Sequence, residues 1–427
     1  MSKSFRVFIL LNSFKFQRLK WLTNIEINSG RRKRSTLNLG YIRQMARLFP
    51  LLLLLTTLSC RQGANDKTPA ANGENRPSPA RSRVIYAQGF TIGYFDHYKE
   101  VKILNHSAAS ADTLDFLLLP AGMAVPPGHA HAQVIRIPVQ SMIVSGSTHI
   151  AQADFAGVAG RITGVGNGQY VINPLVREGL RTGRVRQVGL EGNLNNELVI
   201  SMQPGVLMTM TNPDAAFGEY KTPIDAGIPV LPNADWLETT PLGKAEWVKL
   251  MGALTDREEL VNRKFDSVVQ TYQRLAAIGK AAAVRPSVII GMPFKGTWYM
   301  PAGGSYMAQL LRDAGAGYHW SDTKGTGSLA LSFETVAPEA LTADFWLDVG
   351  DVRARKDILA QDTRFAAFRS FRSDAIYNYN RRVNDAGSSD YWETGAVNPE
   401  RVLADLIRIL HPGALPADSL MYYKQIE

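Results

Sequence analysis

Cysteine is nearly absent from this sequence, because Cys60 is the only one among 427 residues. Disulfides within the chain and a cysteine-based zinc site are therefore excluded. The sequence also lacks the Gly-x-Ser-x-Gly elbow, the Walker loop and the His-Glu-x-x-His helix that mark common hydrolases, nucleotide-binding enzymes and metalloproteases. We therefore predict no catalytic residues and no enzyme activity.

Net positive charge is confined to one segment. Residues 1–59 contain eleven Lys and Arg and a single acid, which gives that segment +10 and leaves −1 for the rest of a chain whose formal net charge is +9. No basic patch remains outside this segment to neutralise phosphates, so we exclude nucleic acid as a partner.

Two short patterns invite a metal or phosphate site. His129-Ala130-His131 lies in a Pro-Gly-rich stretch with no further His or Cys cluster nearby, and such a pair is more often a solvated turn than a metal site. The glycines of 164–168 lack the spacing of a phosphate-binding loop and a helix directly after them. We predict no metal site and no cofactor.

The N-terminal residues are best interpreted as a targeting signal. Residues 45–60 have a basic Arg47, an apolar run, and Leu-Ser-Cys at the end, which resembles a bacterial lipoprotein signal. The resemblance implies cleavage before Cys60 and lipidation of its sulfur, with residues 1–44 as a miscalled start or leader extension. The alternative, a transmembrane anchor, would need roughly 20 apolar residues. Residues 61–83 are rich in Pro, Asn and charge, which predicts a disordered tether.

The longest helical pattern runs from Thr255 to about Ala282. Apolar residues recur at steps of four and three, and Thr255 with Glu258 has the spacing of a capping box. Such a helix would be roughly 40 Å long. We interpret 241–284 as a rigid spine between two lobes, 84–240 and 285–427, although one core helix of a single large domain would give the same pattern.

Both flanking blocks alternate strand and helix patterns. Strand patterns at 133–144, 206–210 and 228–230 and helices at 150–159 and 195–202 predict a parallel sheet before the spine, after short strands within 90–104 and 114–119. Strands at 287–292 and 345–349 and helices at 305–314 and 401–410 predict a second sheet after it. The fold class is therefore α/β, with two Rossmann-like lobes whose strand ends face one cleft.

Several aromatic and polar residues fall in or beside turns and would line such a cleft. Exposed aromatic rings suit a flat, partly apolar ligand. Ser147 and Thr148 follow a strand, where they either contact ligand or only cap a helix. Arg381 either pairs with an anionic chelate or belongs to a solvated pair with Arg382. The candidate ligand-binding residues are Ser147, Thr148, Tyr170, Trp236, Trp298, Tyr299, Tyr306, Arg381, Tyr391 and Trp392.

The order of several short motifs resembles one family. These motifs are Ser147-Thr148-His149-Ile150, Arg161-Ile162-Thr163-Gly164-Val165, Leu242-Gly243-Lys244-Ala245-Glu246-Trp247, Gly296-Thr297-Trp298-Tyr299, Gly303-Gly304-Ser305-Tyr306-Met307-Ala308, and Asn398-Pro399 with His411-Pro412. Together they resemble the helical-spine substrate-binding proteins of ABC importers for iron-siderophore complexes and cobalamin. The resemblance covers nearly everything from Val134 onward, with a departure at Pro204-Gly205, where the family has Pro-Asp.

This resemblance implies a function and partners. It implies a monomeric lipoprotein of the bacterial periplasm that captures a ferric siderophore or related chelate and delivers it to an ABC permease. Glu197 and Glu334 match the two acidic residues that dock such proteins onto permease arginines. A corrinoid or haem is the alternative ligand, and an enzyme of chelatase-like architecture that acts on a tetrapyrrole is the alternative from another class.

Overall fold

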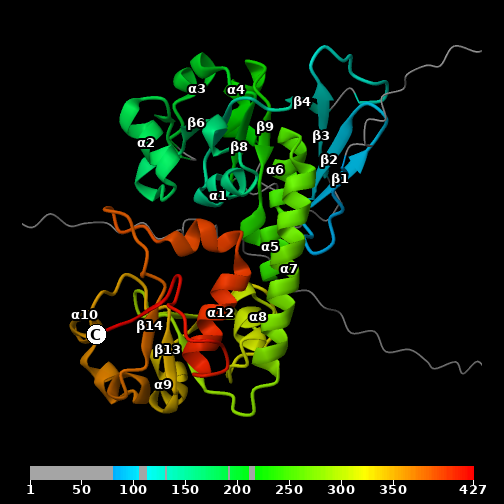
Figure 1. Ribbon diagram of the computed structural model, residues 1–427. Helices are drawn as coiled ribbons and strands as arrows, with labels where there is room; N and C mark the ends of the chain where they lie inside the picture. The colour runs from blue at the N-terminus through cyan, green and yellow to red at the C-terminus, as the bar shows by residue number, and fades with distance from the viewer. Residues whose placement is uncertain (1–79, 105–112, 130–131, 191–192, 211–216) are drawn as a thin grey trace, which may run out of the picture. The chain divides into compact units, whose positions relative to one another are not determined.

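The computed structural model describes residues 80–104, 113–129, 132–190, 193–210 and 217–427. Within them, three larger sheets accompany one long helix, α7 (Glu258–Lys280) (Figure 1). Cys60, the predicted signal and most of the predicted tether lie outside the described residues. Among the described residues, no helix combines the length and apolarity needed to cross a bilayer.

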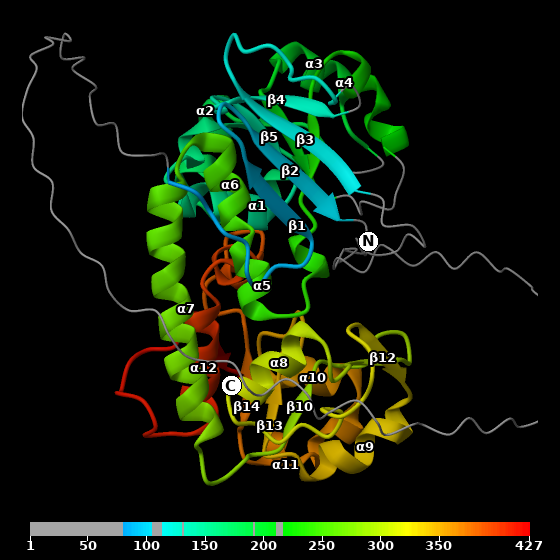
Figure 2. The same ribbon diagram turned by 90° about the vertical axis from the view of Figure 1, so that its right-hand side faces the viewer.

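The first sheet is formed by residues that precede the predicted parallel sheet. It has the order β1-β2-β3-β4, in which the first three strands are antiparallel and the last pair is parallel (Figure 2). Its strands are β1 (Phe90–Tyr94), β2 (Lys99–Leu104), β3 (Thr113–Pro120) and β4 (Gln133–Ile137). Side chains such as Phe116 and Ile135 are fully buried in the main hydrophobic core.

The predicted strand at 133–144 is wrong in one respect. Its first half is β4, and its second half is the separate strand β5 (Met142–Val144), which belongs to another sheet. Pro138 lies between them, and proline has no N–H with which to continue a ladder of hydrogen bonds. The apolar alternation alone does not reveal this change of sheet.

The N-terminal lobe is built on a five-stranded, all-parallel sheet of order β7-β6-β5-β8-β9. Helices between the strands supply the crossovers that parallel pairing requires. The remaining strands are β6 (Ile162–Val165), β7 (Arg186–Gln187), β8 (Val206–Thr209) and β9 (Val230–Pro232), and the helices are α1 (Ser147–Phe155), α2 (Pro174–Thr182), α3 (Asn196–Met202) and α4 (Lys221–Asp225).

The C-terminal lobe contains a sheet of order β10-β13-β14-β15, in which only β15 is antiparallel to its neighbour. The strands are β10 (Val288–Ile290), β13 (Phe345–Leu347), β14 (Ile376–Asn378) and β15 (Lys424–Gln425), with β11 (Trp298–Pro301) and β12 (Ser328–Leu331) as a separate antiparallel pair. The helices are α8 (Tyr306–Asp313), α9 (Phe333–Thr342), α10 (Arg355–Gln361), α11 (Arg369–Arg372) and α12 (Pro399–Leu410). The predicted α/β fold with two lobes is confirmed.

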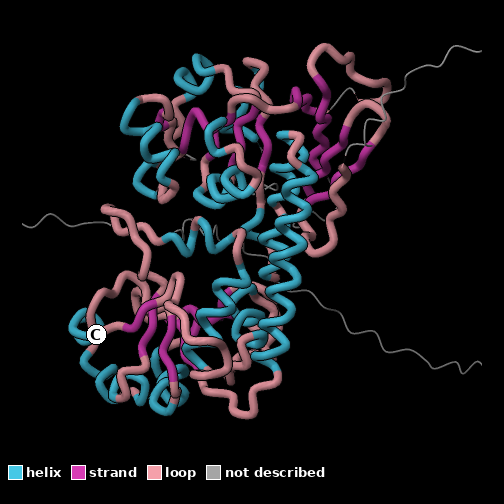
Figure 3. The backbone as a smooth tube through the Cα atoms, viewed as in Figure 1, coloured by secondary structure: helices cyan, strands magenta, loops and turns pink. Residues whose placement is uncertain are grey.

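Helix α7 contacts both lobes, as Figure 3 also shows. Lys264 donates to the carbonyl oxygen of Phe155 at 2.6 Å, and Tyr272 donates to Asp313 of α8 at 2.8 Å. Its 23 residues correspond to about 35 Å of helix. The predicted apolar stripe is confirmed, because Val261, Phe265, Val268, Tyr272 and Leu275 are all buried.

The predicted capping box at the start of α7 is wrong. Thr255 is the last residue of α6 (Val248–Thr255), and its hydroxyl donates to the carbonyl oxygen of Met251. Asp256 then adopts a left-handed conformation, and the α7 cap, Arg257, makes no side-chain capping bond. Glu258 instead pairs with Lys99 of β2. Thr255 and Glu258 have the spacing of a capping box, but Thr255 ends α6 and Glu258 begins α7.

The chain enters the folded body through backbone N–H groups held by two carboxylates. Glu246 of α5 (Pro241–Glu246) is fully buried and accepts from the amides of residues 85–87 at 2.5 to 3.0 Å. Glu238 accepts from the amides of residues 88 and 89. Lys249 balances the charge of Glu246 at 2.7 Å. These contacts fix residues 85–89 against α5.

Candidate functional site

Loops that follow strands of both lobes meet at one junction. Ser147 follows β5, and its hydroxyl donates to the carbonyl oxygen of Trp392 at 3.4 Å. Asn384 follows β14 and donates through Nδ2 to the carbonyl oxygen of Gln169, after β6, at 2.8 Å. We call residues 379–393 the bridging segment. Because ligands of α/β proteins bind at the carboxyl ends of parallel strands, this junction is the candidate site.

Aromatic rings of the bridging segment form a stack at this junction. Tyr379 and Tyr391 are stacked with centroids 5.0 Å apart, and the indole of Trp392 meets them edge-on at 5.3 and 5.0 Å. Tyr391 is only 5% exposed, whereas Trp392 is 52% exposed. Trp392 therefore exposes an apolar face to solvent, and the two tyrosines support it.

The phenol of Tyr306 in α8 interacts electrostatically with carboxylates from both lobes. Burial raises its pKa above the ordinary value, and Tyr422, Asp235 and Asp348 raise it further through their charges. Asp235 follows β9 in the N-terminal lobe, and Asp348 follows β13 in the C-terminal lobe. The ammonium of Lys244 lies 5.5 Å from the centre of the Tyr306 ring. Tyr306 therefore stays a neutral phenol that can donate a hydrogen bond.

Asp348 has two unusual features for a residue at a strand end. Its φ is +58°, a strained value for a residue other than glycine, and strain of this kind persists mainly at functional sites. Its Oδ1 atom is buried and has no hydrogen-bond partner among the described residues. Burial raises the pKa of Asp348 to about 7, and its interaction with Tyr423 opposes this shift. Asp348 can therefore exchange a proton near neutral pH.

A buried polar network supports the N-terminal side of the junction. Asn233 donates to Gln152 at 2.7 Å, and Gln152 donates to Asp235 at 3.3 Å. Burial lowers the pKa of the neighbouring His149 to about 4, against the opposing charge of Asp235. His149 is therefore neutral at physiological pH, which leaves Asp235 without a cationic neighbour in this network.

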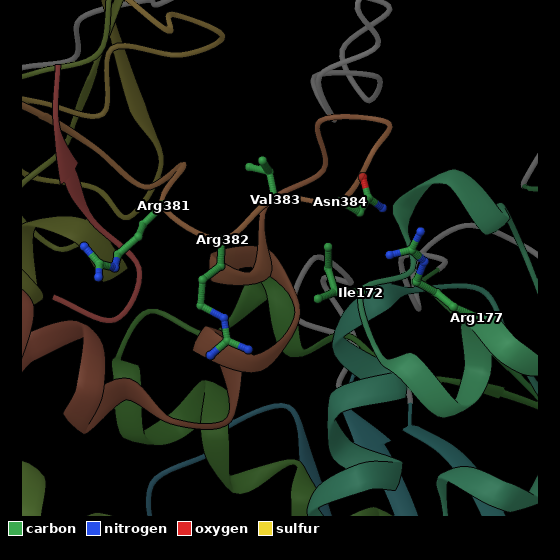
Figure 4. Close-up of a pocket in the computed structure, with 6 residues that line it drawn as sticks. All are labelled: Ile172, Arg177, Arg381, Arg382, Val383 and Asn384. Atoms are coloured by element: carbon green, nitrogen blue, oxygen red, sulfur yellow. The ribbon is translucent and has the colours of Figure 1, made fainter. Parts of the chain in front are cut away.

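A hollow of about 340 Å³ opens beside the bridging segment (Figure 4). Its lining includes three arginines, of which Arg177 pairs with Asp385 at 2.8 Å and Arg382 with the buried Asp390 at 3.0 Å. The Arg381 guanidinium makes no hydrogen bond or ion pair with any described residue. Figure 4 shows that the side chains of Arg381 and Arg382 point in different directions. Among these three arginines, Arg381 is thus the one left available to an anionic group.

Ser147 and Thr148 do not cap α1. The cap is Gly146, and the two residues occupy the first two helical positions. The capping interpretation is therefore wrong. Thr148 is buried, and its Oγ1 atom has no hydrogen-bond partner among the described residues.

Three further predicted aromatics are partly exposed. Tyr170 follows β6 and is 37% exposed, and Trp236 follows β9 and is 39% exposed. The indole N–H of Trp236 donates to the carbonyl oxygen of Met210 at 3.1 Å. Tyr299, at 42% exposed, lies on β11 rather than in a turn. These rings remain available to a ligand.

The prediction that Trp298 binds ligand is wrong. The ring is 0% exposed and packs against Trp346, Phe333, Phe365 and Phe368. Its indole N–H donates to the carbonyl oxygen of Ile290 at 2.8 Å. Trp298 therefore holds β11 against β10 within the C-terminal lobe.

The sequence interpretation missed four residues of this junction: Asp235, Asp348, Tyr379 and Glu393. Asp348 was placed inside a predicted strand at 345–349, but β13 ends one residue before it. Strand β14, which places Tyr379, is only three residues long and was not predicted. A search for acids directly after short apolar runs would have found Asp348.

Glu197 and Glu334 occupy matching positions in the two lobes. Each is exposed and is the second residue of its helix, two residues after the caps Asn195 and Ser332. Their helices, α3 and α9, each lead into a strand, β8 or β13, that pairs with the first strand of its parallel sheet. Neither carboxylate makes an ion pair with a described residue, and Arg364, whose charge interacts with that of Glu334, pairs with Asp362 instead.

No cluster of three or more metal-ligating side chains occurs among the described residues. His129, which precedes β4, lies 3.4 Å from the hydroxyl of Tyr98, which precedes β2. Its predicted companion, His131, lies outside the described residues.

Known proteins resemble this chain in sequence and in fold. No protein-family model matches the sequence. A lipoprotein of Methanocaldococcus jannaschii, named as uncharacterized, is 28% identical over 293 residues, which are 66% of this chain and 67% of that protein. A second such lipoprotein of the same organism is 23% identical over 384 residues, 87% of this chain and 93% of that protein.

Solved structures of similar fold are periplasmic solute-binding proteins. The CeuE protein of Helicobacter pylori, solved with Ni(II) bound, has a TM-score of 0.51 and 16% identity over 70% of this chain and 92% of its own. A possible iron-binding, periplasmic solute-binding protein of Staphylococcus epidermidis has a TM-score of 0.50 and 16% identity, over 64% of this chain and 99% of its own. The periplasmic haem-binding protein HutB of Vibrio cholerae has a TM-score of 0.50 and 16% identity, over 64% of this chain and 100% of its own. This chain therefore shares the two-lobed fold of these solved binding proteins.

Proposed function

We propose that this chain is the substrate-binding lipoprotein of an ABC importer and that it captures a ferric siderophore or a related metal chelate. The observation that carries the proposal is the exposed indole of Trp392, which lies where strand ends of both lobes meet. A flat, partly apolar chelate would contact this ring by dispersion and stacking. The names of the solved relatives, which are binding proteins for solutes, support a binding role rather than an enzymatic one.

The rest of the site provides polar groups around this ring. Arg381 would pair with an anionic arm of the chelate, and Tyr306 and Asp348 would donate or accept hydrogen bonds. Exposed aromatics complete the proposed contacts. The ligand-binding set that we propose comprises Ser147, Thr148, Tyr170, Trp236, Tyr299, Tyr306, Asp348, Arg381 and Trp392, and the buried Tyr391 would support Trp392 from behind. Haem and cobalamin, which also have flat and partly apolar faces, are the alternative ligands.

Delivery would use the two matching glutamates. Glu197 and Glu334 offer one free carboxylate on each lobe, and two separated charges fix the orientation of a protein on its partner more than they add affinity. We propose that they dock onto arginines of the permease, and that Cys60 carries the lipid that holds the protein at the cell envelope. The lipoprotein names of the sequence relatives support this location.

Native mass spectrometry of the protein purified from iron-limited cells and from cells supplied with cobalamin or haemin tests the ligand class. We expect a single bound chelate that is lost after Trp392→Ala and retained after Phe95→Ala. Phe95 is a suitable control because it is an aromatic residue that directly follows β1, outside the junction, with a similar exposure, 46%. Protein that carries no chelate from any of these cells would contradict the proposal.

A further inference from the structure

The bridging segment also makes a second set of contacts with the N-terminal lobe, which involve no aromatic ring. The carboxylate of Glu393 accepts from the amides of Ile172 and Asn173 at 2.8 and 2.7 Å. Glu393 is 1% exposed, and Asn173 is the cap of α2. A carboxylate of one lobe therefore lies at the N-terminus of a nine-residue helix of the other, where the helix dipole favours negative charge.

Asn384 makes the neighbouring connection. Its Nδ2 donates to the carbonyl oxygens of Gln169 and Val171 at 2.8 and 3.1 Å. Its Oδ1 accepts from the amides of Ala386 and Ser388, both at 3.0 Å, which fixes the orientation of the side chain. The tip of the bridging segment therefore holds residues 169–171 by their main chain.

A third contact is of a different kind. Arg177 pairs with Asp385 at 2.8 Å, but the Asp385 side chain is 95% exposed. Exposed ion pairs contribute little, because water screens them and both side chains lose freedom. This pair therefore offers an internal control for the buried contacts of Glu393 and for the less exposed contacts of Asn384.

We propose that Glu393 and Asn384 are positioning residues of an interlobe clamp. Together they hold residues 169–173 against the bridging segment, which fixes the separation of the lobes at this side of the junction. Glu393 directly follows Trp392, so the same contacts set the position of the exposed indole. The clamp acts on the geometry of the site whatever ligand that site takes.

Two opposing contributions act on the carboxyl group of Glu393 in the clamp, namely its burial and its hydrogen bonds. The carboxylate forms no ion pair with a described residue, and its charged neighbours, Asp390 and Asp154, are both acids. Burial and these acids raise the pKa of Glu393 to about 8, while the two amide hydrogen bonds oppose the shift. A buried carboxylate without a cation is costly, and separation of the lobes would return it to water.

Hydrogen exchange of the full chain tests the clamp without any ligand. Glu393→Ala is expected to accelerate exchange of the Ile172 and Asn173 amides about tenfold or more, because each loses its hydrogen-bond acceptor. Glu393→Gln, which keeps one acceptor oxygen, is expected to give an intermediate rate. Asn384→Ala is expected to accelerate exchange of the amides of residues 169–171. Asp385→Ala is expected to leave all these exchange rates within about twofold of the wild type.

Quenching of tryptophan fluorescence by acrylamide adds a readout for Trp392. Both Glu393→Ala and Asn384→Ala are expected to increase quenching, and this increase is expected to disappear when Trp392→Phe is added. Unchanged exchange at residues 172 and 173 in Glu393→Ala would overturn the proposal. An equal acceleration across strands β5 to β9, with a lowered Tm, would also overturn it, because Glu393 would then support the N-terminal lobe as a whole.

Discussion

Replacement of Trp298 by alanine separates the tryptophan that holds the fold from the one proposed to bind ligand. Trp298 is 0% exposed and lies among four aromatic rings. Removal of a buried tryptophan leaves a cavity and costs about 3 to 5 kcal/mol of unfolding free energy. Loss of the hydrogen bond to the Ile290 carbonyl adds about 1 kcal/mol. We therefore expect a destabilisation of about 4 to 6 kcal/mol for Trp298→Ala.

Urea unfolding measures this difference, with Trp392→Ala as the matched comparison. Trp392 is 52% exposed, so its removal is expected to cost less than about 1.5 kcal/mol of stability while it weakens chelate binding by about 1 to 3 kcal/mol. Folded Trp298→Ala protein, measured at low urea concentration, is expected to bind as the wild type does. A Trp298→Ala variant of normal stability but reduced affinity would refute this assignment and return Trp298 to the binding site.

Four further expectations concern other parts of the chain. Cys60→Ala is expected to leave the precursor unprocessed and without lipid, so acyl labelling equal to the wild type would count against lipidation. The double change Glu197→Lys and Glu334→Lys is expected to abolish uptake through repulsion from the permease, while chelate affinity is unchanged. Glu259→Lys, an exposed change on α7, is the control. Normal uptake by the double variant would exclude a docking role for the two glutamates. The pKa of Asp348 in the folded protein, about 7, exceeds the ordinary 3.8. The unfolding free energy of the wild type relative to Asp348→Asn is therefore expected to be highest below about pH 4 and to fall as the pH rises to 7, by at most about 1.4 kcal/mol per pH unit. Urea unfolding at several pH values measures this difference, and a difference that does not change with pH would contradict the burial argument. Glu246→Ala is expected to cost about 3 to 5 kcal/mol of unfolding free energy, because Lys249 and three amides lose their buried partner, and a change below about 1 kcal/mol would contradict that role.

Local patterns predicted the elements that depend on local forces. The buried stripe of α7 follows from the helical period, and α8 follows from Ser305 at its start. The helix predicted at 401–410 lies within α12, which begins two residues earlier at Pro399. The positions of Glu197 and Glu334 on matching helices came from the family resemblance, and their exposure agrees with it. These features need no knowledge of distant contacts.

The parts that were missed depend on residues far apart in the chain. Glu393 meets Ile172 across 221 positions, and no local pattern contains that information. Trp298 appeared to be a turn residue because Gly296, with a φ of +81°, lies just before it, yet the ring turns into an aromatic core assembled from three later segments. The sheet change at Pro138 is similar, because both halves of the predicted strand are strands but pair with different partners.

Titration of the purified chain with haemin, cyanocobalamin and a ferric siderophore tests the central claim most directly, with Trp392→Ala measured in parallel. We expect one of these chelates to quench tryptophan fluorescence with a Kd of about 1 μM or lower, and the Kd to rise about fivefold to a hundredfold in Trp392→Ala. Failure of all three to bind, or equal affinity in the wild type and the variant, would contradict a chelate site between the lobes at Trp392.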